Sequence, residues 1–196
     1  MAEMKVPTIV LASASPRRAE LLRSAGIPFT VDVANIAEDV VPGEMPTQHA
    51  ERLAQEKAKV VAKRNPGKIV LGADTIVVVD DQILGKPRHT RDAARMLHLL
   101  SGRNHHVITG VCLAKRTTSN QQLATESGRT TVVFGQLQES EIDDYVATRE
   151  PMDKSGAYAI QGIASRWITR IEGDYANVVG LPVALVWKML QEFTAQ

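Results

Sequence analysis

A short segment near the start of the chain could hold a phosphate. Residues 13–18 read Ser-Ala-Ser-Pro-Arg-Arg and follow the apolar run 8–12, which predicts a buried strand. Pro16 favours the first turn of a helix, because its missing N–H costs nothing there. The free N–H groups of a helix N-terminus attract anions. The segment therefore predicts either a phosphate loop or an ordinary helix cap.

The side chains of this segment fit an anion. Ser13 and Ser15 add hydroxyl donors. Arg17 or Arg18 could grip a phosphate through paired N–H bonds, and Arg17 is the arginine that we expect to make this contact. Solvated arginines explain the same residues about equally well.

Asp74 follows a second apolar run. We expect a strand over 69–71 that delivers Gly-Ala-Asp, with a further strand over 75–79. A carboxylate at the end of a buried strand costs several kcal/mol unless it is paired or bound to metal. Asp74 therefore needs a partner, either a lysine or a divalent cation, unless it only caps a turn.

Three more charged residues could share that chemistry. Glu38 lies in a polar loop and could be a second carboxylate for a metal. Lys57 lies on a predicted helix that begins with Thr47 as its cap, on a face whose charges we expect to be mostly solvated. Lys86 stands between Gly85 and Pro87, outside any regular charged face, and suits phosphate as a point charge.

A third cluster, residues 153–162, combines small residues with an amide. Tyr158–Ile160 reads as a strand, and Gln161 follows it before a glycine. A glutamine amide offers a donor and an acceptor, which suits the imide edge of a pyrimidine. On local grounds, an exposed turn residue explains Gln161 more simply.

The elements that must position these residues alternate early and cluster later. This pattern predicts an α/β fold with a mixed, elongated central sheet flanked by helices. We expect one domain over 1–196, made of two lobes with a substrate cleft between them. Helices are expected over 17–25, 47–63, 90–100, 139–148 and 181–193, and strands over 8–12, 29–33, 69–71, 75–79, 83–84, 105–115, 123–134, near 137, 158–160, 168–171 and 177–179.

Composition excludes several classes of function. The 23 basic and 22 acidic residues leave a net charge of +1, so no nucleic-acid partner is expected. Cys112 is the only cysteine, which rules out a disulfide within the chain and a cysteine zinc site, and we expect it to be an inert core thiol. The five histidines share no ligand spacing. No apolar run is long enough to span a membrane and no signal peptide is evident, so we expect a cytoplasmic protein without a membrane partner.

Taken in order, the motifs resemble those of the Maf family of nucleoside triphosphate pyrophosphatases. They are LASASPRR, GADTIV, GKP, LSGR, EPMDKSGAYAIQG and VVGLP, and they extend over nearly the whole chain. AYAIQG and the threonine directly after Asp74 are similar to the dTTP/UTP subgroup. The resemblance implies a Maf/ITPase-like fold, a nucleoside triphosphate substrate, and cleavage between the α- and β-phosphates to a monophosphate and pyrophosphate.

The resemblance also implies roles for individual residues. Asp74 matches the proton acceptor of the family, and a divalent cation, magnesium or manganese, is implied, with Glu38 and Asp74 as its expected ligands. The positions that match substrate specificity are Arg17, Thr75 and Gln161, and Ser13, Ser15, Lys57 and Lys86 complete the expected substrate site.

Two other classes of function stay in view. A non-catalytic nucleotide-binding regulator of cell division or septum formation would keep the phosphate loop but would need no proton acceptor. A P-loop kinase is excluded because no GxxxxGK[ST] motif is present. The sequence leaves open whether modified pyrimidine nucleotides are preferred and whether the chain forms a homodimer.

Overall fold

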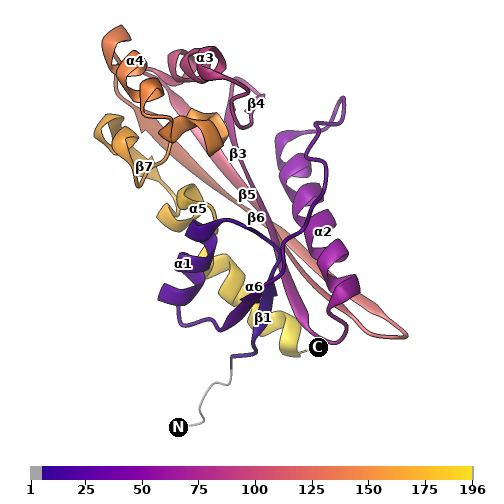
Figure 1. Ribbon diagram of the computed structural model, residues 1–196. Helices are drawn as coiled ribbons and strands as arrows, with labels where there is room; N and C mark the ends of the chain where they lie inside the picture. Colours follow the sequence, from indigo (N-terminus) through magenta and orange to yellow (C-terminus); the bar gives the residue numbers. More distant parts are fainter. Residues whose placement is uncertain (1–5, 196) are drawn as a thin grey trace. The chain divides into compact units, whose positions relative to one another are not determined.

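The computed structural model describes residues 6–195 and has an α/β architecture (Figure 1). Its strands form a seven-stranded mixed sheet in the order β2-β1-β3-β5-β6-β7, with β4 paired to β3. The strands are β1 Ile9–Leu11, β2 Phe29–Val31, β3 Ile69–Val79, β4 Gln82–Leu84, β5 Asn104–Arg116, β6 Gln121–Phe134 and β7 Ile168–Glu172. The helices are α1 Pro16–Ser24, α2 Pro46–Arg64, α3 Thr90–Leu100, α4 Glu139–Ala147, α5 Tyr175–Val179 and α6 Val183–Ala195, with short 3-10 turns η1 Glu150–Asp153, η2 Ser155–Ala157 and η3 Ile163–Trp167.

The chain divides into two compact units. The first unit holds the segment that ends at Asp74, Thr109–Gly128 and the segment from Gly180 onward, and the second holds Thr75–Ile108 and Arg129–Val179. The predicted α/β class with a mixed sheet is confirmed, because β1 pairs in parallel with β2 and β3 whereas β4 and β7 pair antiparallel. The assignment of 1–196 to one domain stays a prediction.

In the first unit, helices cover both faces of the strands. Helix α2 lies on one face and α1 with α6 on the other (Figure 1). The α2 face is built from small side chains, among them Ala54 and Ala58, which pack against Val10 and Val70. The other face is bulkier, since Leu22 of α1 and Phe193 of α6 pack there. Small residues on α2 let the helix approach the sheet closely.

Two glycines make that approach possible. A Cβ at Gly72 of β3 would lie 2.2 Å from the Ala54 carbonyl oxygen, and one at Gly110 of β5 would lie 2.3 Å from the Ala50 carbonyl oxygen. Both distances are well inside van der Waals contact, and the atoms met belong to the α2 backbone. Gly72 therefore lets α2 pack directly over β3, two residues before Asp74.

The second unit has its own core. Helices α3 and α4 lie side by side, and Met96, Leu97 and Leu100 of α3 pack with Ile142 of α4 against the strands. The α3 boundaries, Thr90–Leu100, match the predicted amphipathic helix. In the same core His105 stacks edge-on against Phe134 and Tyr158.

Several predicted boundaries are wrong. Residues 69–79 form one continuous strand, so Asp74 lies in the middle of β3. Met45, not Thr47, caps α2, because Pro46 already occupies the first helical position. The residues near 137 and 158–160 are not strands, and 177–179 belong to α5. The strand expected over 168–171 is β7, which pairs with β6.

A turn at Asp80-Asp81 joins the strands expected over 75–79 and 83–84, and the expected core position of the Cys112 thiol is confirmed. Both aspartates have positive φ and join β3 to β4, and Asp80 is paired with Arg103. Cys112 is fully buried, and burial raises the pKa of its thiol. No helix within residues 6–195 is both long and apolar enough to cross a bilayer.

Candidate active site

The 13–18 segment is a strand-to-helix turn, as predicted. Strand β1 ends at Leu11, α1 begins at Pro16, and Ser15 is the cap residue with extended backbone and no side-chain capping bond. The Ser13 hydroxyl accepts a hydrogen bond from the Ser15 N–H at 3.2 Å. The α1 N-terminus therefore keeps N–H groups that its own cap side chain does not occupy.

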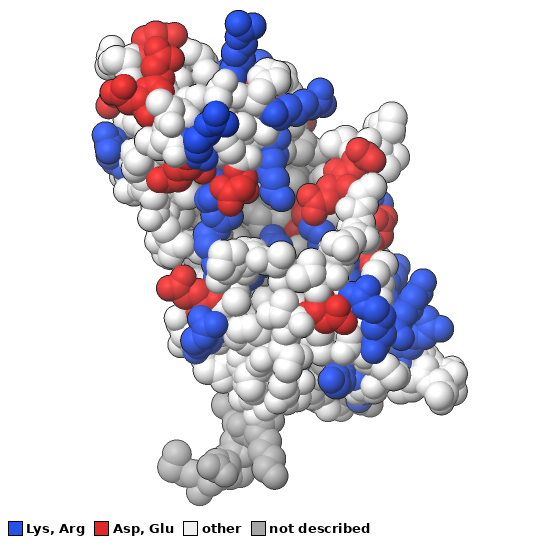
Figure 2. Space-filling view, viewed as in Figure 1, with Lys and Arg blue, Asp and Glu red and all other residues white. Residues whose placement is uncertain are grey.

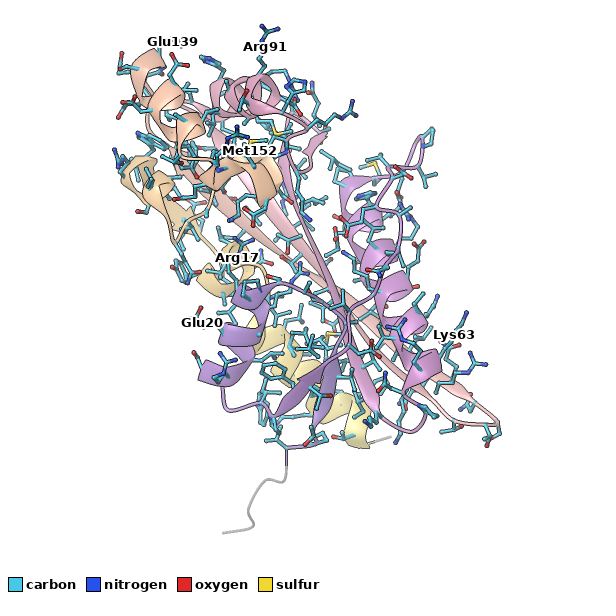
Figure 3. The ribbon with its side chains drawn as sticks, viewed as in Figure 1. Arg17, Glu20, Lys63, Arg91, Glu139 and Met152 are labelled. Carbon is cyan, nitrogen blue, oxygen red and sulfur yellow. The ribbon has the colours of Figure 1, made fainter. Side chains whose placement is uncertain are left out.

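Arg18, rather than Arg17, is the arginine built into this loop. Arg18 Nη1 donates to Ser13 Oγ at 3.1 Å, and its Nε donates to the Gly180 carbonyl at 2.8 Å. Arg18 is only 9% exposed, whereas Arg17 is partly exposed at the start of α1 (Figure 3). Burial lowers the pKa of the Arg18 guanidinium, and the charges of Asp74 and Glu38 act against that effect. Arg18 thus ties the loop to the turn before α6 while its charge faces two carboxylates.

The predicted charged residues of the first unit meet at one ammonium group. Lys57 Nζ lies 2.6 Å from Asp74 Oδ1 and 2.6 Å from Glu38 Oε1. The Lys57 and Asp74 side chains are 9% and 10% exposed, whereas Glu38 is 45% exposed. Of the partners considered for Asp74, the structure shows the lysine. Lys57 is therefore buried and paired, not part of a solvated helical face.

The solvated face lies further along α2. Lys63 and Arg64 are exposed in its last turn, where positive charge favours the helix dipole. Figure 2 shows lysine and arginine side chains gathered over this end of the helix, and Lys63 points away from the body in Figure 3.

A second arginine holds the loop that carries Glu38. Arg52 donates to both carboxylate oxygens of Glu44, at 2.7 and 3.0 Å, and to the Asp39 carbonyl at 2.9 Å. His49 Nδ1 lies 3.0 Å from the same carboxylate. The hydrogen bonds from Arg52 lower the pKa of Glu44 to about 2. The Arg52–Glu44 pair thus fastens the 38–45 loop to α2, one turn away from Lys57.

The oxygen atoms of this cluster suit a hard divalent cation. Asp74 Oδ1 accepts a hydrogen bond from Lys57 Nζ at 2.6 Å. No group of three or more His, Cys, Asp or Glu side chains in that range could enclose a metal. Magnesium is usually held by one or two carboxylates, with substrate phosphates and waters completing its shell. Asp74 and Glu38 fit that pattern.

The other predicted site residues belong to the second unit. The Thr75 carbonyl accepts a hydrogen bond from the Ser155 hydroxyl at 2.9 Å, and the Gly85 carbonyl accepts one from the Gly156 N–H at 3.1 Å. Gly156 has φ of 70°, and a Cβ there would lie 2.8 Å from Val77. The 154–157 segment is therefore fastened to β3 and to the loop that carries the exposed Lys86.

Gln161 is exposed at a turn, as the simpler local explanation predicted. The Gly162 N–H donates to the Ala159 carbonyl at 3.1 Å, which closes the turn around it. The Glu150 carboxylate accepts a hydrogen bond from the Ile163 N–H at 3.0 Å. The amide of Gln161 is thus presented by a turn with defined ends.

Sequence reasoning missed Arg52 and Glu44 as contributors, and it did not foresee the contact of Arg18 with the Gly180 carbonyl. An arginine that stabilises a loop through backbone carbonyls leaves no periodic signal, because its partners are remote in sequence. The spacing of Arg52 and Lys57 on α2 gave some indication, since residues five apart on a helix differ by about 140° and can both face a loop that wraps its edge.

Comparison with known proteins assigns the chain to a family. Residues 8–193 match the family model described as "Maf-like protein". The chain therefore belongs to the Maf family.

Two similar proteins are named dTTP/UTP pyrophosphatase. The one from Koribacter versatilis is 52% identical over 183 residues, which cover 93% of each chain. The one from Geobacter sulfurreducens is 50% identical over 192 residues, which cover 98% of this chain and all of the relative. Among solved structures, the Ham1 protein of Staphylococcus aureus has a similar fold, with a TM-score of 0.50, 13% identity and coverage of 94% of this chain and 98% of that one.

Proposed function

We propose that this chain is a nucleoside triphosphate pyrophosphatase that hydrolyses dTTP and UTP between the α- and β-phosphates. The products are the nucleoside monophosphate and pyrophosphate. The observation that carries the proposal is the buried Lys57–Asp74 pair beside the phosphate loop residue Arg18. The names of relatives about 50% identical over nearly the full chain support the choice of substrates.

The chemistry requires charge neutralisation and an aligned water more than a covalent intermediate. The α1 N-terminus, with Ser13, Ser15 and Arg17, holds the triphosphate, and Lys86 adds a further cation. Asp74 accepts a proton from the attacking water through the oxygen that Lys57 does not occupy. Lys57, 2.6 Å from Asp74 Oδ1, orients the carboxylate for that role.

A divalent cation, magnesium or manganese, completes the proposal, with Asp74 and Glu38 as its protein ligands. Such an ion would supply charge stabilisation on the phosphate oxygens. Metal binding and proton acceptance both depend on the Asp74 carboxylate. Measuring both properties in one variant separates the two roles. If Asp74→Asn retained most of the hydrolysis rate while losing affinity for manganese, the proton-acceptor role would be wrong.

Thr75 and Gln161 are proposed to select the base. The amide of Gln161 can donate to and accept from the imide edge of thymine or uracil. Gln161→Glu removes the donor and adds a charge, so the selectivity for dTTP over dGTP should fall strongly. Unchanged selectivity in that variant would contradict the assignment.

The same function places the protein with its nucleotide pool in the cytoplasm. Fractionation of cells that express the chain tests this directly, and recovery mainly in a membrane or exported fraction would contradict it.

A further inference from the structure

Two side chains outside the proposed substrate site, Tyr145 and Glu150, hold the turn that carries Gln161. Tyr145 lies near the end of α4 and is 1% exposed. Glu150 opens the 3-10 turn η1, directly after Arg149, whose φ is 67°. The Tyr145 hydroxyl donates to Glu150 Oε1 at 3.1 Å, so the two form one hydrogen-bonded pair.

This pair holds one end of the turn, and a backbone hydrogen bond closes the other. At the far end, Glu150 Oε1 also accepts from the Ile163 N–H at 3.0 Å. At the near end, the Gly162 N–H donates to the Ala159 carbonyl at 3.1 Å and closes the turn. Gln161 lies between these two anchored positions.

The fit around the carboxylate is close. A Cβ at Gly162 would lie 1.9 Å from Glu150 Oε1, so any larger residue would displace this carboxylate from its present position. Tyr145 is itself fixed, because it stacks edge-on against Trp167 with ring centroids 5.2 Å apart. The Trp167 indole N–H donates to Glu141 Oε1 at 3.0 Å. Trp167, itself held by Glu141, thus fixes the Tyr145 ring of the pair.

We propose that Tyr145 and Glu150 are positioning residues for base selection, which act by holding the turn that presents Gln161. The inference rests on the proposed role of Gln161 as the reader of the pyrimidine. Neither side chain needs to touch the substrate. An amide that reads a base must be held in one orientation, since its donor and acceptor are useful only when both face the imide edge.

Selectivity for dTTP over dGTP, as the ratio of kcat/KM values, tests the proposal. Tyr145→Phe keeps the ring and its packing but removes the hydroxyl, and we expect selectivity to fall about tenfold, as for the loss of one well-placed hydrogen bond. Glu150→Ala should act similarly, whereas Glu150→Gln, which keeps the acceptor oxygen, should retain most of the selectivity. Tyr175→Phe, on an exposed tyrosine, is the matched control and should change nothing.

A double-mutant cycle separates positioning from a general structural effect. In a Gln161→Ala background, Tyr145→Phe should cause no further loss of selectivity, because the group that it positions is gone. The same tenfold loss in both backgrounds would overturn the proposal, and so would full selectivity in both Tyr145→Phe and Glu150→Ala.

Hydrogen exchange at the Ile163 amide tests the pin without reference to activity. Glu150→Ala should accelerate this exchange at least tenfold and Gln161→Ala should not. If the wild-type chain failed to hydrolyse any pyrimidine triphosphate, the proposed function would fall, whereas unchanged exchange in Glu150→Ala would refute the pin itself.

Discussion

Replacing Lys57 with methionine tests how much the buried Lys57–Asp74 ion pair contributes to the free energy of unfolding. The two charges are 2.6 Å apart and both side chains are about nine-tenths buried. At an effective dielectric constant of about 20, their direct attraction is on the order of 6 kcal/mol, and desolvation offsets much of it.

Removal of one partner costs more than the net value of the pair, because it leaves Asp74 as an unpaired buried carboxylate. Such losses are about 3–5 kcal/mol for buried pairs. We expect Lys57→Met to lower the free energy of unfolding by about 3 kcal/mol, at the lower end of that range, because the Arg18 charge still faces Asp74.

Urea denaturation of four proteins measures the effect: wild type, Lys57→Met, Asp74→Asn and the double variant. The double variant should recover most of the loss, because a neutral amide is far cheaper to bury than a charge. Lys63→Met, an exposed lysine on the same helix, is the control and should change stability by less than about 1 kcal/mol. A Lys57→Met protein as stable as the control, or a double variant no more stable than Lys57→Met, would refute the reasoning.

Three further predictions follow from contacts outside this pair. Burial lowers the pKa of His105 to about 3, so below pH 6.5 the unfolded chain binds a proton that the folded chain does not. The free energy of unfolding should therefore fall by about 1.4 kcal/mol per pH unit between pH 6 and 5. Urea melts at several pH values should show this slope in the wild type and its loss in His105→Gln, and equal slopes in the two proteins would contradict the prediction. Gly72→Ala should destabilise the fold by about 3 kcal/mol in the same melts, because its Cβ would meet α2 backbone, and a neutral substitution would show that α2 can move away. Arg52→Ala removes the contacts with Glu44 and the Asp39 carbonyl, so it should speed proteolysis within the 38–45 loop, as measured by mass spectrometry of early fragments. Arg95→Ala, which removes a surface contact on α3, is the control. An unchanged cleavage rate in Arg52→Ala would mean that these contacts do not hold the loop.

The sequence was most informative where a local pattern decides the structure. The bounds of α3 and the strand-to-helix turn at residues 13–18 depend on neighbours in the chain, and both were predicted. The β3 strand was divided at Asp74 because a central carboxylate contradicts local strand preference. Its partner, Lys57, lies 17 positions earlier on another element, so only tertiary structure shows why the strand continues.

The candidate site shows the same limit. Single motifs could not separate a phosphate loop from a helix cap, and only their order along the chain pointed to one function. The sequence could not show that Arg18 is tied to the loop, because the Gly180 carbonyl that receives Arg18 is 162 positions away. The strand expected at 158–160 was wrong because the chain turns there, with the Gly162 N–H donating to the Ala159 carbonyl and not to a neighbouring strand.

The identity of the products formed from dTTP tests the central claim most directly. Phosphorus NMR of a reaction with magnesium should show dTMP and pyrophosphate in equal amounts, and Asp74→Asn should reduce their formation at least a hundredfold, on the order expected for loss of a general base. Formation of dTDP and inorganic phosphate, or no hydrolysis of dTTP or UTP by the wild-type chain, would contradict the account.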